Sequence, residues 1–574
     1  MVNERVGPKE GNLHFWEEPL HQVQRGLHSI ITIDFHDYIR KWGPLAILIG
    51  IVAGVGAMAF QLLLEAIWSL SYHSVALPWF IIIFLPAAGA FLAGAVMQRW
   101  SPESAGGGTD SIIESLQHKG GDMPSRVAPV KIVASSLTIG SGGSAGREGA
   151  ISHICGSLGS LLGNRLHLSR SDRRILVICG MAAGLSAVFR APLGSAIYAI
   201  EVPYKNDLES SAAIPAIIAS VVSYLVFLPF GGFNPIFEAP EIPFELSLGS
   251  IPFIILVGLI AGLASIALIL LLRSVADIYG RSKLSLPLAA GSAGLLVGVI
   301  GLVEPEVLGL SEDVIQDIIT GSVLTVGALV VLLVAKVVAT SLTVGSGGSG
   351  GVFFPSLLVG AAIGGAVASS LSLQPAALFT LAGMGAVMAG VSKTPLAAPI
   401  LVTEMVGGYS ALIPIMIAST ISYLATGDYS LYKNQITRRA FRLDLSNLSR
   451  VKVRRIMTSS VVSVREDMTL LEVKTIASQH PHYLYPVVTA ENSVVGVLPM
   501  GMVGQDRWKL VREVMQTHYE EVEPDSSALD AFERMTTHQI SRMLVIENGR
   551  LAGVLTRLDV VKAMEHLDER HRNF

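Results

Sequence analysis

The chain has 574 residues, 51% of them hydrophobic and 15% charged, and its formal net charge at pH 7 is −4. A charge this close to zero excludes the strongly basic surface on which nucleic acid binds. The two cysteines, Cys155 and Cys179, lie in apolar segments, so the sequence has no disulfide framework and predicts buried, inert thiols.

Hydropathy divides the chain into two parts. Apolar segments separated by short polar turns occupy about residues 43–427, whereas the chain from about 433 onward has a soluble composition. This predicts an all-α polytopic membrane protein followed by a small α/β module. We expect four parts, which are a cytoplasmic N-terminal segment (1–40), a membrane domain (41–445) and two small domains (446–508 and 509–574).

The membrane part reads as a series of apolar helices. Many of them are too short, or too broken by glycine and proline, to cross a bilayer alone, and such backbone is tolerated only where protein buries it or it lines a cavity. The segments predicted are 42–70, 78–97, a short piece after the glycine-rich break 105–110, 127–139, 150–162, 175–202 (divided at Pro192), 212–230, 251–272, 287–302, 323–344, 355–371, 376–391, 395–405 and 411–425.

Basic residues indicate which ends of these helices face the cytoplasm. The first forty residues are polar, with a candidate interfacial helix over 28–39, and they lack a signal-peptide pattern. Because lysine and arginine concentrate in cytoplasmic loops, we expect both termini to be cytoplasmic and the protein to lie in the inner (plasma) membrane of a prokaryote. The basic residues concerned are Arg40, Lys41 and Arg99 beside the first two spans, and Arg438, Arg439, Arg442, Arg450, Lys452, Arg454 and Arg455 after the last.

An internal repeat organises the membrane part. Residues 131–146 match residues 336–351 at twelve of sixteen positions, and a second pair of motifs runs from Gly180 to Glu201 and from Gly383 to Glu404. Two halves with glycine-broken helices are typical of transporters that bind their substrate where the repeats meet. We therefore predict inverted repeats over about 43–230 and 250–426.

The first copy of the repeat carries the residues that point to function. The stretch 140–149 ends in Gly146, Arg147, Glu148 and Gly149, and an apolar helix follows it. A carboxylate at membrane depth is expensive and is therefore a candidate functional group. Glycines let backbone N–H groups approach a ligand, and a helix N-terminus attracts an anion. In the second copy Phe353 stands where Glu148 stands in the first.

The soluble tail repeats too. Residues 453–503 resemble residues 511–564, and each unit has a helix, an apolar strand, a Gly-Val-Leu strand and a closing helix. The two units are predicted to be small α/β modules that pack together.

With these motifs assembled, the chain resembles the CLC family of chloride channels and chloride/proton exchangers, and its tail is similar to a tandem CBS pair. The resemblance implies a homodimer in which each subunit carries chloride or another small monovalent anion. Glu148 matches the gating glutamate, which would block the outer anion position when ionised. The other positions implied for anion binding are Gly106, Gly107, Gly108, Gly146, Arg147, Gly149, Gly351, Val352, Phe353 and Tyr432.

Two departures from the family pattern bear on function. Gly107 replaces a serine, which removes a hydroxyl from the central site and leaves the choice of anion open. Val202 occupies the position where exchangers usually carry a second acid, and Glu201 lies one place early, about 100° around a helix. Because Glu201 has a counterpart in Glu404, we interpret it as structural. These observations favour a gated anion channel, with a proton-coupled exchanger as the alternative.

The tail raises the question of a nucleotide. Thr556 and Asp559 match the Thr-x-x-Asp of CBS modules that hold an adenine nucleotide such as ATP, whereas residues 499–502 of the first module do not. Nucleotide sensing and a purely structural role both remain open.

Two other function classes fit poorly. Gly140, Gly142 and Gly146 only loosely imitate a dinucleotide fingerprint, which needs a soluble βαβ unit, so we expect no enzyme, no catalytic residue, no required cofactor and no metal. A cation transporter would need several intramembrane acids, and only Glu148 sits centrally.

Overall fold

The computed structural model describes residues 35–73, 78–240, 247–321, 325–437, 448–449, 451–503, 508–538, 540–560 and 563. The chain forms two compact units, residues 1–436 and residues 437–574. The proposed interfacial helix over 28–39 lies mostly outside the described residues, as do Arg438, Arg439, Arg442 and Arg450.

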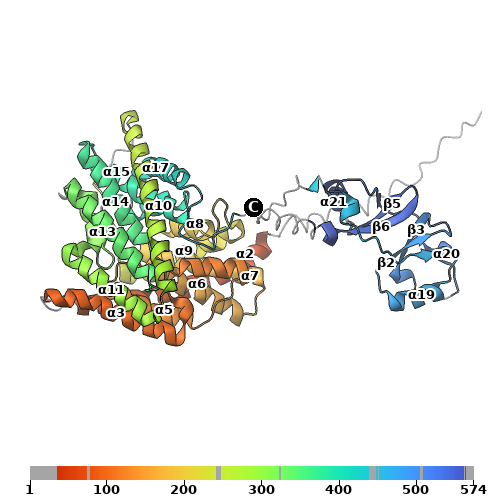
Figure 1. Cartoon of the computed structure of the whole chain (residues 1–574), viewed down its shortest axis with the longest axis horizontal. Coiled ribbons are helices and arrows are strands. Elements are labelled where there is room, and N and C mark those ends of the chain that lie inside the picture. The colour runs from red at the N-terminus through yellow and green to blue at the C-terminus, as the bar shows by residue number, and fades with distance from the viewer. Residues whose placement is uncertain are drawn as a thin grey trace, which may run out of the picture. The chain divides into compact units, whose positions relative to one another are not determined.

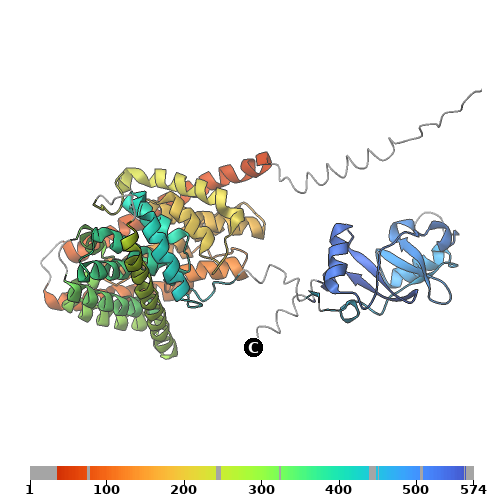
Figure 2. The ribbon, with the colours of Figure 1, turned by 90° about the horizontal axis from the view of Figure 1, so that it is seen from above.

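The first unit is a bundle of helices, as the sequence predicted (Figures 1 and 2). Seven helices of the described residues are long and apolar enough to cross a membrane. The helices are α2 (Phe35–Trp68), α3 (Trp79–Trp100), α4 (Thr109–His118), α5 (Val127–Gly140), α6 (Glu148–Arg165), α7 (Arg170–Phe189), α8 (Pro192–Glu201), α9 (Ala213–Gly231), α10 (Ile251–Arg281), α11 (Leu286–Val303), α12 (Glu312–Thr320), α13 (Val326–Gly345), α14 (Phe353–Ser370), α15 (Ala376–Ser392), α16 (Ala397–Val406) and α17 (Leu412–Ala425).

Nearly every predicted segment appears, including the break between α7 and α8 before Pro192. The sequence analysis missed α12, although Val314, Ile315, Ile318 and Ile319 follow helical spacing and are buried. The helix is short and begins with two acids, so it lacks the long apolar run by which the other segments were predicted.

The two halves exchange matching contacts, which is the mark of an inverted repeat. The Ser135 and Ser349 hydroxyls lie 2.8 Å apart, and those of their counterparts Thr340 and Ser144 lie 3.1 Å apart. Each contact joins one half to the other, so neither half completes its polar contacts alone.

Glycines set the distance between the helices. A side chain at Gly54 of α2 would meet Val226 of α9, and one at Gly262 of α10 would meet Ala425 of α17. These two glycines belong to matching Gly-x-x-x-Gly pairs in the two halves. Close backbone approach of this kind is how helices associate in lipid, where hydrophobic burial supplies little driving force.

The second unit holds two small α/β modules, as predicted. The first has β1 (Val464–Arg465), α19 (Leu470–Gln479), β2 (Leu484–Val488), β3 (Val494–Pro499) and α20 (Val511–Val514). The second has β4 (Glu521–Val522), α21 (Ala528–Thr537), β5 (Arg542–Glu547) and β6 (Arg550–Thr556). The sheets have the same order, β1-β2-β3 and β4-β5-β6, with one parallel and one antiparallel pair each. Backbone bridges such as Val497 to Gln516 join the modules.

The packing of α14 on α15 gives a test of the bundle. A methyl group at Gly364 would overlap the backbone carbonyl of Phe379, whereas one at Gly280 on α10 would meet nothing within 4 Å. We expect Gly364→Ala to destabilise the fold by about 1–3 kcal/mol through overpacking. Gly280→Ala should leave stability unchanged or raise it slightly because alanine favours the helix. Thermal unfolding in detergent measures both, and equal midpoints for the two variants would contradict this packing.

Candidate functional site

The two copies of the glycine motif meet at the centre of the bundle. The N–H of Gly146 donates to the carbonyl of Gly351 at 2.8 Å, and the N–H of Gly351 donates back to Gly146 at 2.6 Å. Helices α6 and α14 begin two residues after this bridge, at Glu148 and Phe353. The bridge therefore brings two helix N-termini together inside the membrane unit.

The Glu148 carboxylate occupies the space in front of α14. Its Oε1 accepts a hydrogen bond from the Phe353 N–H, and the side chain also interacts with the Phe354 N–H. Glu148 is only 4% exposed, and its Oε2 is buried without a hydrogen-bond partner. A Cβ at Gly146 or Gly351 would overlap this carboxylate, so glycine is needed at both positions.

Aromatic side chains close the opposite side of this position. The Phe353 ring stacks on Phe189 with centroids 4.7 Å apart, and Tyr198 meets it edge-on at 6.0 Å. The hydroxyls of Tyr198 and Tyr432 lie 3.0 Å apart. The predicted Tyr432 thus reaches the site, together with Tyr198, which the sequence analysis did not single out.

The glycine-rich break at residues 106–108 lies beside α6. Gly108 is the N-cap of α4, and a Cβ at Gly149 would strike the Gly107 carbonyl. Gly106 is held to the second repeat, since its N–H donates to the Gly347 carbonyl at 3.3 Å. A Cβ at Gly107 itself would have its nearest neighbour 3.8 Å away, so packing does not exclude a serine there. Thr109 at the start of α4 interacts with the Tyr432 hydroxyl.

Arg147 turns away from Glu148. Its guanidinium forms an ion pair with Glu312 of α12 at 2.9 Å and donates to Gln61 of α2 and the Val188 carbonyl. It also lies over the Phe354 ring, 5.1 Å from the centroid. The residue is therefore close to the site through its backbone, while its side chain faces a neighbouring cavity. Glu312 was missed with the rest of α12.

Glu201 is fully occupied by backbone donors. Its two carboxylate oxygens accept from Leu396 N at 3.0 Å and Ala397 N at 2.7 Å, where α16 begins. Its repeat counterpart Glu404 accepts from Leu193 N at 3.2 Å and Gly194 N at 2.7 Å, where α8 begins. Each acid caps a helix of the other half, which supports the structural interpretation of Glu201.

Val202, at the position of the missing acid, is completely buried. Its carbonyl accepts from Gln435 Nε2 at 2.9 Å, and the same amide nitrogen also donates to the carbonyls of Tyr204 and Ser392 at 3.0 Å. The Val202 backbone is thus held by an uncharged amide.

The lysines that open the two motifs are buried and hold backbone carbonyls. Lys131 donates to Ser104 O at 2.8 Å and Gly106 O at 2.7 Å, and Lys336 donates to Val307 O at 3.0 Å and Gly309 O at 3.1 Å. Neither side chain is exposed, so neither lysine extends to the membrane interface.

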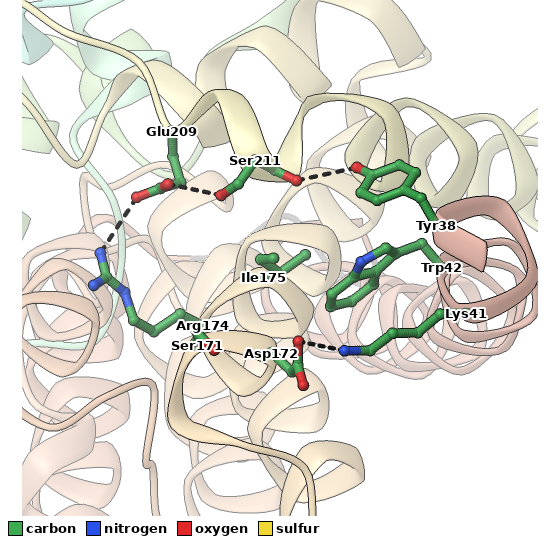
Figure 3. A pocket seen from close by; sticks show the side chains of 9 residues that line it. All are labelled: Tyr38, Lys41, Trp42, Ser171, Asp172, Arg174, Ile175, Glu209 and Ser211. Atoms are coloured by element: carbon green, nitrogen blue, oxygen red, sulfur yellow. Dashed lines mark hydrogen bonds and ion pairs between the residues drawn. The ribbon is translucent and has the colours of Figure 1, made fainter. Parts of the chain in front are cut away.

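A second cavity, of about 470 Å³, lies where the N-terminal ends of α2 and α7 meet (Figure 3). Each charge that lines it has a partner, since Lys41 pairs with Asp172 at 2.7 Å and Arg174 pairs with Glu209 at 3.3 Å. It therefore lacks the uncompensated positive charge that an anion site needs.

The second unit has a cleft of about 670 Å³ between its modules. It is lined by Tyr483, Leu484, Val497, Gln516, His518, Tyr519, Glu520, His538, Ile540, Ser541, Arg542, Met543 and Leu544. A hydrogen bond from His538 at 2.7 Å holds the pKa of the Glu520 carboxyl below its ordinary value. This contact therefore adds stability at neutral pH and loses it as the pH falls through the lowered pKa.

The predicted nucleotide residues do not line this cleft. The hydroxyl and N–H of Thr556 both donate to the Asp559 carboxylate, at 2.6 and 2.9 Å. No group of three or more potential metal ligands occurs among the residues that the structure describes.

Comparison with known proteins agrees with this geometry. A family model described as "Voltage gated chloride channel" matches residues 89–427, and the CBS domain model matches residues 453–502 and 511–566. The chain is 29% identical over 418 residues to "Putative chloride channel protein ClcB-like" of Ralstonia nicotianae, covering 69% of this chain and 96% of that protein. It is 29% identical over 449 residues to "H(+)/Cl(-) exchange transporter ClcA" of Salmonella agona, covering 72% of this chain and 94% of that protein.

Solved structures share the fold. A slow cyanobacterial Cl−/H+ antiporter superimposes with a TM-score of 0.61 at 24% identity, covering 68% of this chain and 95% of that one. A CLC-type fluoride/proton antiporter superimposes with a TM-score of 0.64 at 24% identity, covering 71% and 100%.

The caps on α8 and α16 give a direct test. Glu201→Gln and Glu404→Gln each keep the shape but lose charge-assisted acceptance, which we expect to cost about 1.5–3 kcal/mol. Both variants should lower the thermal midpoint by similar amounts. Glu238→Gln, at an exposed side chain, is the matched control and should unfold like the wild type. A stable Glu201→Gln beside an unstable Glu404→Gln would contradict the symmetric structural role.

Proposed function

The chain belongs to the CLC family, and we propose that it is a proton-coupled exchanger of chloride or a similar monovalent anion, with Glu148 as the gate that also carries the proton. The relatives are named as channels or transporters and not as enzymes. Anion transport follows from the family, whereas coupling to protons is the proposal.

The observation that carries the proposal is the Glu148 carboxylate bonded to the Phe353 N–H. The ionised side chain fills a position that suits an anion, because the partial positive charges of two helix N-termini converge there. Protonation removes the negative charge and weakens that bond. The side chain then leaves, and a chloride ion takes its place against the same N–H groups.

The sequence analysis favoured a passive channel because Val202 replaces an acid. Two considerations support the alternative. A relative matched over 72% of this chain is named as an exchange transporter, and two solved structures that share the fold are named as antiporters. In addition, the anion position is buried, since the Glu148 carboxylate that fills it is only 4% exposed. An occluded site is what alternating exchange requires.

Replacing the gate tests the coupling. In liposomes with symmetrical chloride and an imposed proton gradient, we expect the wild type to move chloride uphill. Glu148→Gln cannot bind the proton, so it should lose uphill movement and pH dependence while passive chloride flux persists. Glu238→Gln should behave like the wild type. A wild type that only dissipates chloride gradients would overturn exchange and support the channel.

We also propose that both termini face the cytoplasm and that the protein is a homodimer in the inner (plasma) membrane. The end of the bundle that holds Lys41, Arg170, Arg173 and Arg174 is rich in basic residues, as cytoplasmic ends are. The homodimer rests on the family resemblance.

The tail contains a CBS pair, and we propose that it binds an adenine nucleotide in the cleft between the modules. The cleft brings together rings for stacking, such as Tyr483 and Tyr519, and the cationic Arg542 for a phosphate. Asp559 could serve the ribose only after releasing Thr556.

Full-length protein titrated with a fluorescent ATP analogue tests this. We expect Arg542→Ala to weaken binding by about tenfold through the loss of a charge-assisted contact. Asp559→Asn separates two arrangements: weakened binding assigns the ribose to Asp559, and unchanged binding assigns the nucleotide to the cleft alone. Wild-type protein that binds no analogue would leave the pair a structural module.

A further inference from the structure

A cavity of about 330 Å³ lies between α2 and the C-terminal ends of α7 and α9. Two arginines, Arg147 and Arg190, line it together with one acid, Glu65. Arg147 is only 6% exposed, and its Nε is buried without a hydrogen-bond partner. The cavity is therefore polar and positively biased at a depth where an unpaired donor is costly.

Arg190 and its repeat counterpart, Lys393, differ in how their side-chain donors are hydrogen-bonded. Both Arg190 and Lys393 end a helix in the left-handed conformation, with φ of 52° and 60°. Lys393 is 2% exposed, and its ammonium donates to Thr426 Oγ1 and the Tyr423 carbonyl. Arg190 makes one hydrogen bond to the described residues, from Nη1 to the Asn234 carbonyl at 2.5 Å. The Lys393 ammonium is therefore hydrogen-bonded within the fold, whereas most N–H donors of the Arg190 guanidinium remain available to the cavity.

The cavity adjoins the anion position. Arg147 directly precedes Glu148, and its guanidinium donates to the Val188 carbonyl at 3.4 Å. The next residue, Phe189, stacks on Phe353 at 4.7 Å, and Arg190 follows it. Residues 188–190, at the C-terminal end of α7, therefore link the cavity wall to the Phe353 ring beside the anion position.

The neighbouring cavity, of about 290 Å³, has the opposite charge. Glu65, Glu306, Glu312 and Asp313 line it, with Arg147 as the one basic residue. Arg147 is already paired with Glu312 on that side. An approaching anion is repelled there, which leaves the arginine cavity as the favourable entrance.

We propose that Arg190 and Arg147 form an outer recruitment site for a small monovalent anion, occupied before the ion reaches Glu148. The inference rests on the proposed anion pathway and adds a second binding position to it. Positive charge in a low-dielectric cavity concentrates anions locally, and the effect falls as salt screens it.

The test measures initial chloride uptake against external chloride in right-side-out and inside-out membrane vesicles at low ionic strength. We expect Arg190→Gln to raise the half-saturating chloride concentration about fivefold on one membrane face only. Arg190→Lys, which keeps the charge, should restore most of the affinity. Raising the ionic strength with an impermeant salt should shrink the difference.

A second variant guards against a loss of folding at Arg190. Glu65 is exposed, lines the same cavity and accepts from Gln61 Nε2 at 2.5 Å, a contact that the amide oxygen of Glu65→Gln can keep. This variant removes negative charge and should lower the half-saturating concentration on the same face. Superimposable curves for the wild type, Arg190→Gln and Glu65→Gln would overturn the recruitment site, as would equal changes on both faces. That failure is distinct from failure of the proposed function, in which the wild type itself moves no chloride or shows no coupling.

Discussion

A helix that ends inside a membrane leaves backbone N–H groups without partners, and the cost of burying them governs this structure. Helices α6 and α14 both begin at the centre of the bundle. An anion satisfies their donors, and in the observed arrangement the Glu148 carboxylate does so at Phe353 N. The glycines around it follow from the same constraint, because any side chain at Gly146 or Gly351 would take the volume of the carboxylate. In the proposed mechanism the gate and the binding site are therefore one set of N–H groups, for which the Glu148 carboxylate and the anion compete.

The inverted repeat builds the framework of the membrane unit, and we assign function to the residues that break its symmetry. Contacts that hold the frame occur twice, as in the helix caps of Glu201 and Glu404 and the carbonyl contacts of Lys131 and Lys336. The contact at the proposed anion position occurs once. Glu148 binds the N–H of its own counterpart Phe353, which places the acid next to the axis that relates the halves. Sequence repetition therefore helps to separate structural from functional acids in this chain.

The sequence was sufficient for the long apolar helices, the repeat and the central motif, because these depend on local composition and spacing, whereas the short α12 was missed. The helix boundaries at Pro192 and Glu148 follow from proline chemistry and from glycine-rich turns. The sequence could not assign Glu312 as the partner of Arg147, since the pair joins segments 165 residues apart. Tyr198 and Arg190 were missed for the same reason: their importance arises from what the other half places beside them. Likewise, the Thr-x-x-Asp pattern predicted a ligand for Thr556 and Asp559, whereas the structure has the two side chains bonded to each other.

If the chain couples anion movement to protons as proposed, Val202 in place of an acid constrains how a proton reaches Glu148. Glu201 is a poor intermediate, because taking up a proton would weaken two backbone hydrogen bonds that cap α16. Each such charge-assisted hydrogen bond contributes about 1.5–3 kcal/mol, so protonation of Glu201 would lower the stability of the fold. A relay would then have to use neutral groups such as the hydroxyls of Tyr198 and Tyr432, which lie 3.0 Å apart and can pass a proton along hydrogen bonds without holding a charge. A relay of neutral hydroxyls stores no proton between turnovers. In the proposed exchanger, Glu148 is then the group at which protonation of the carboxylate and binding of the anion are linked.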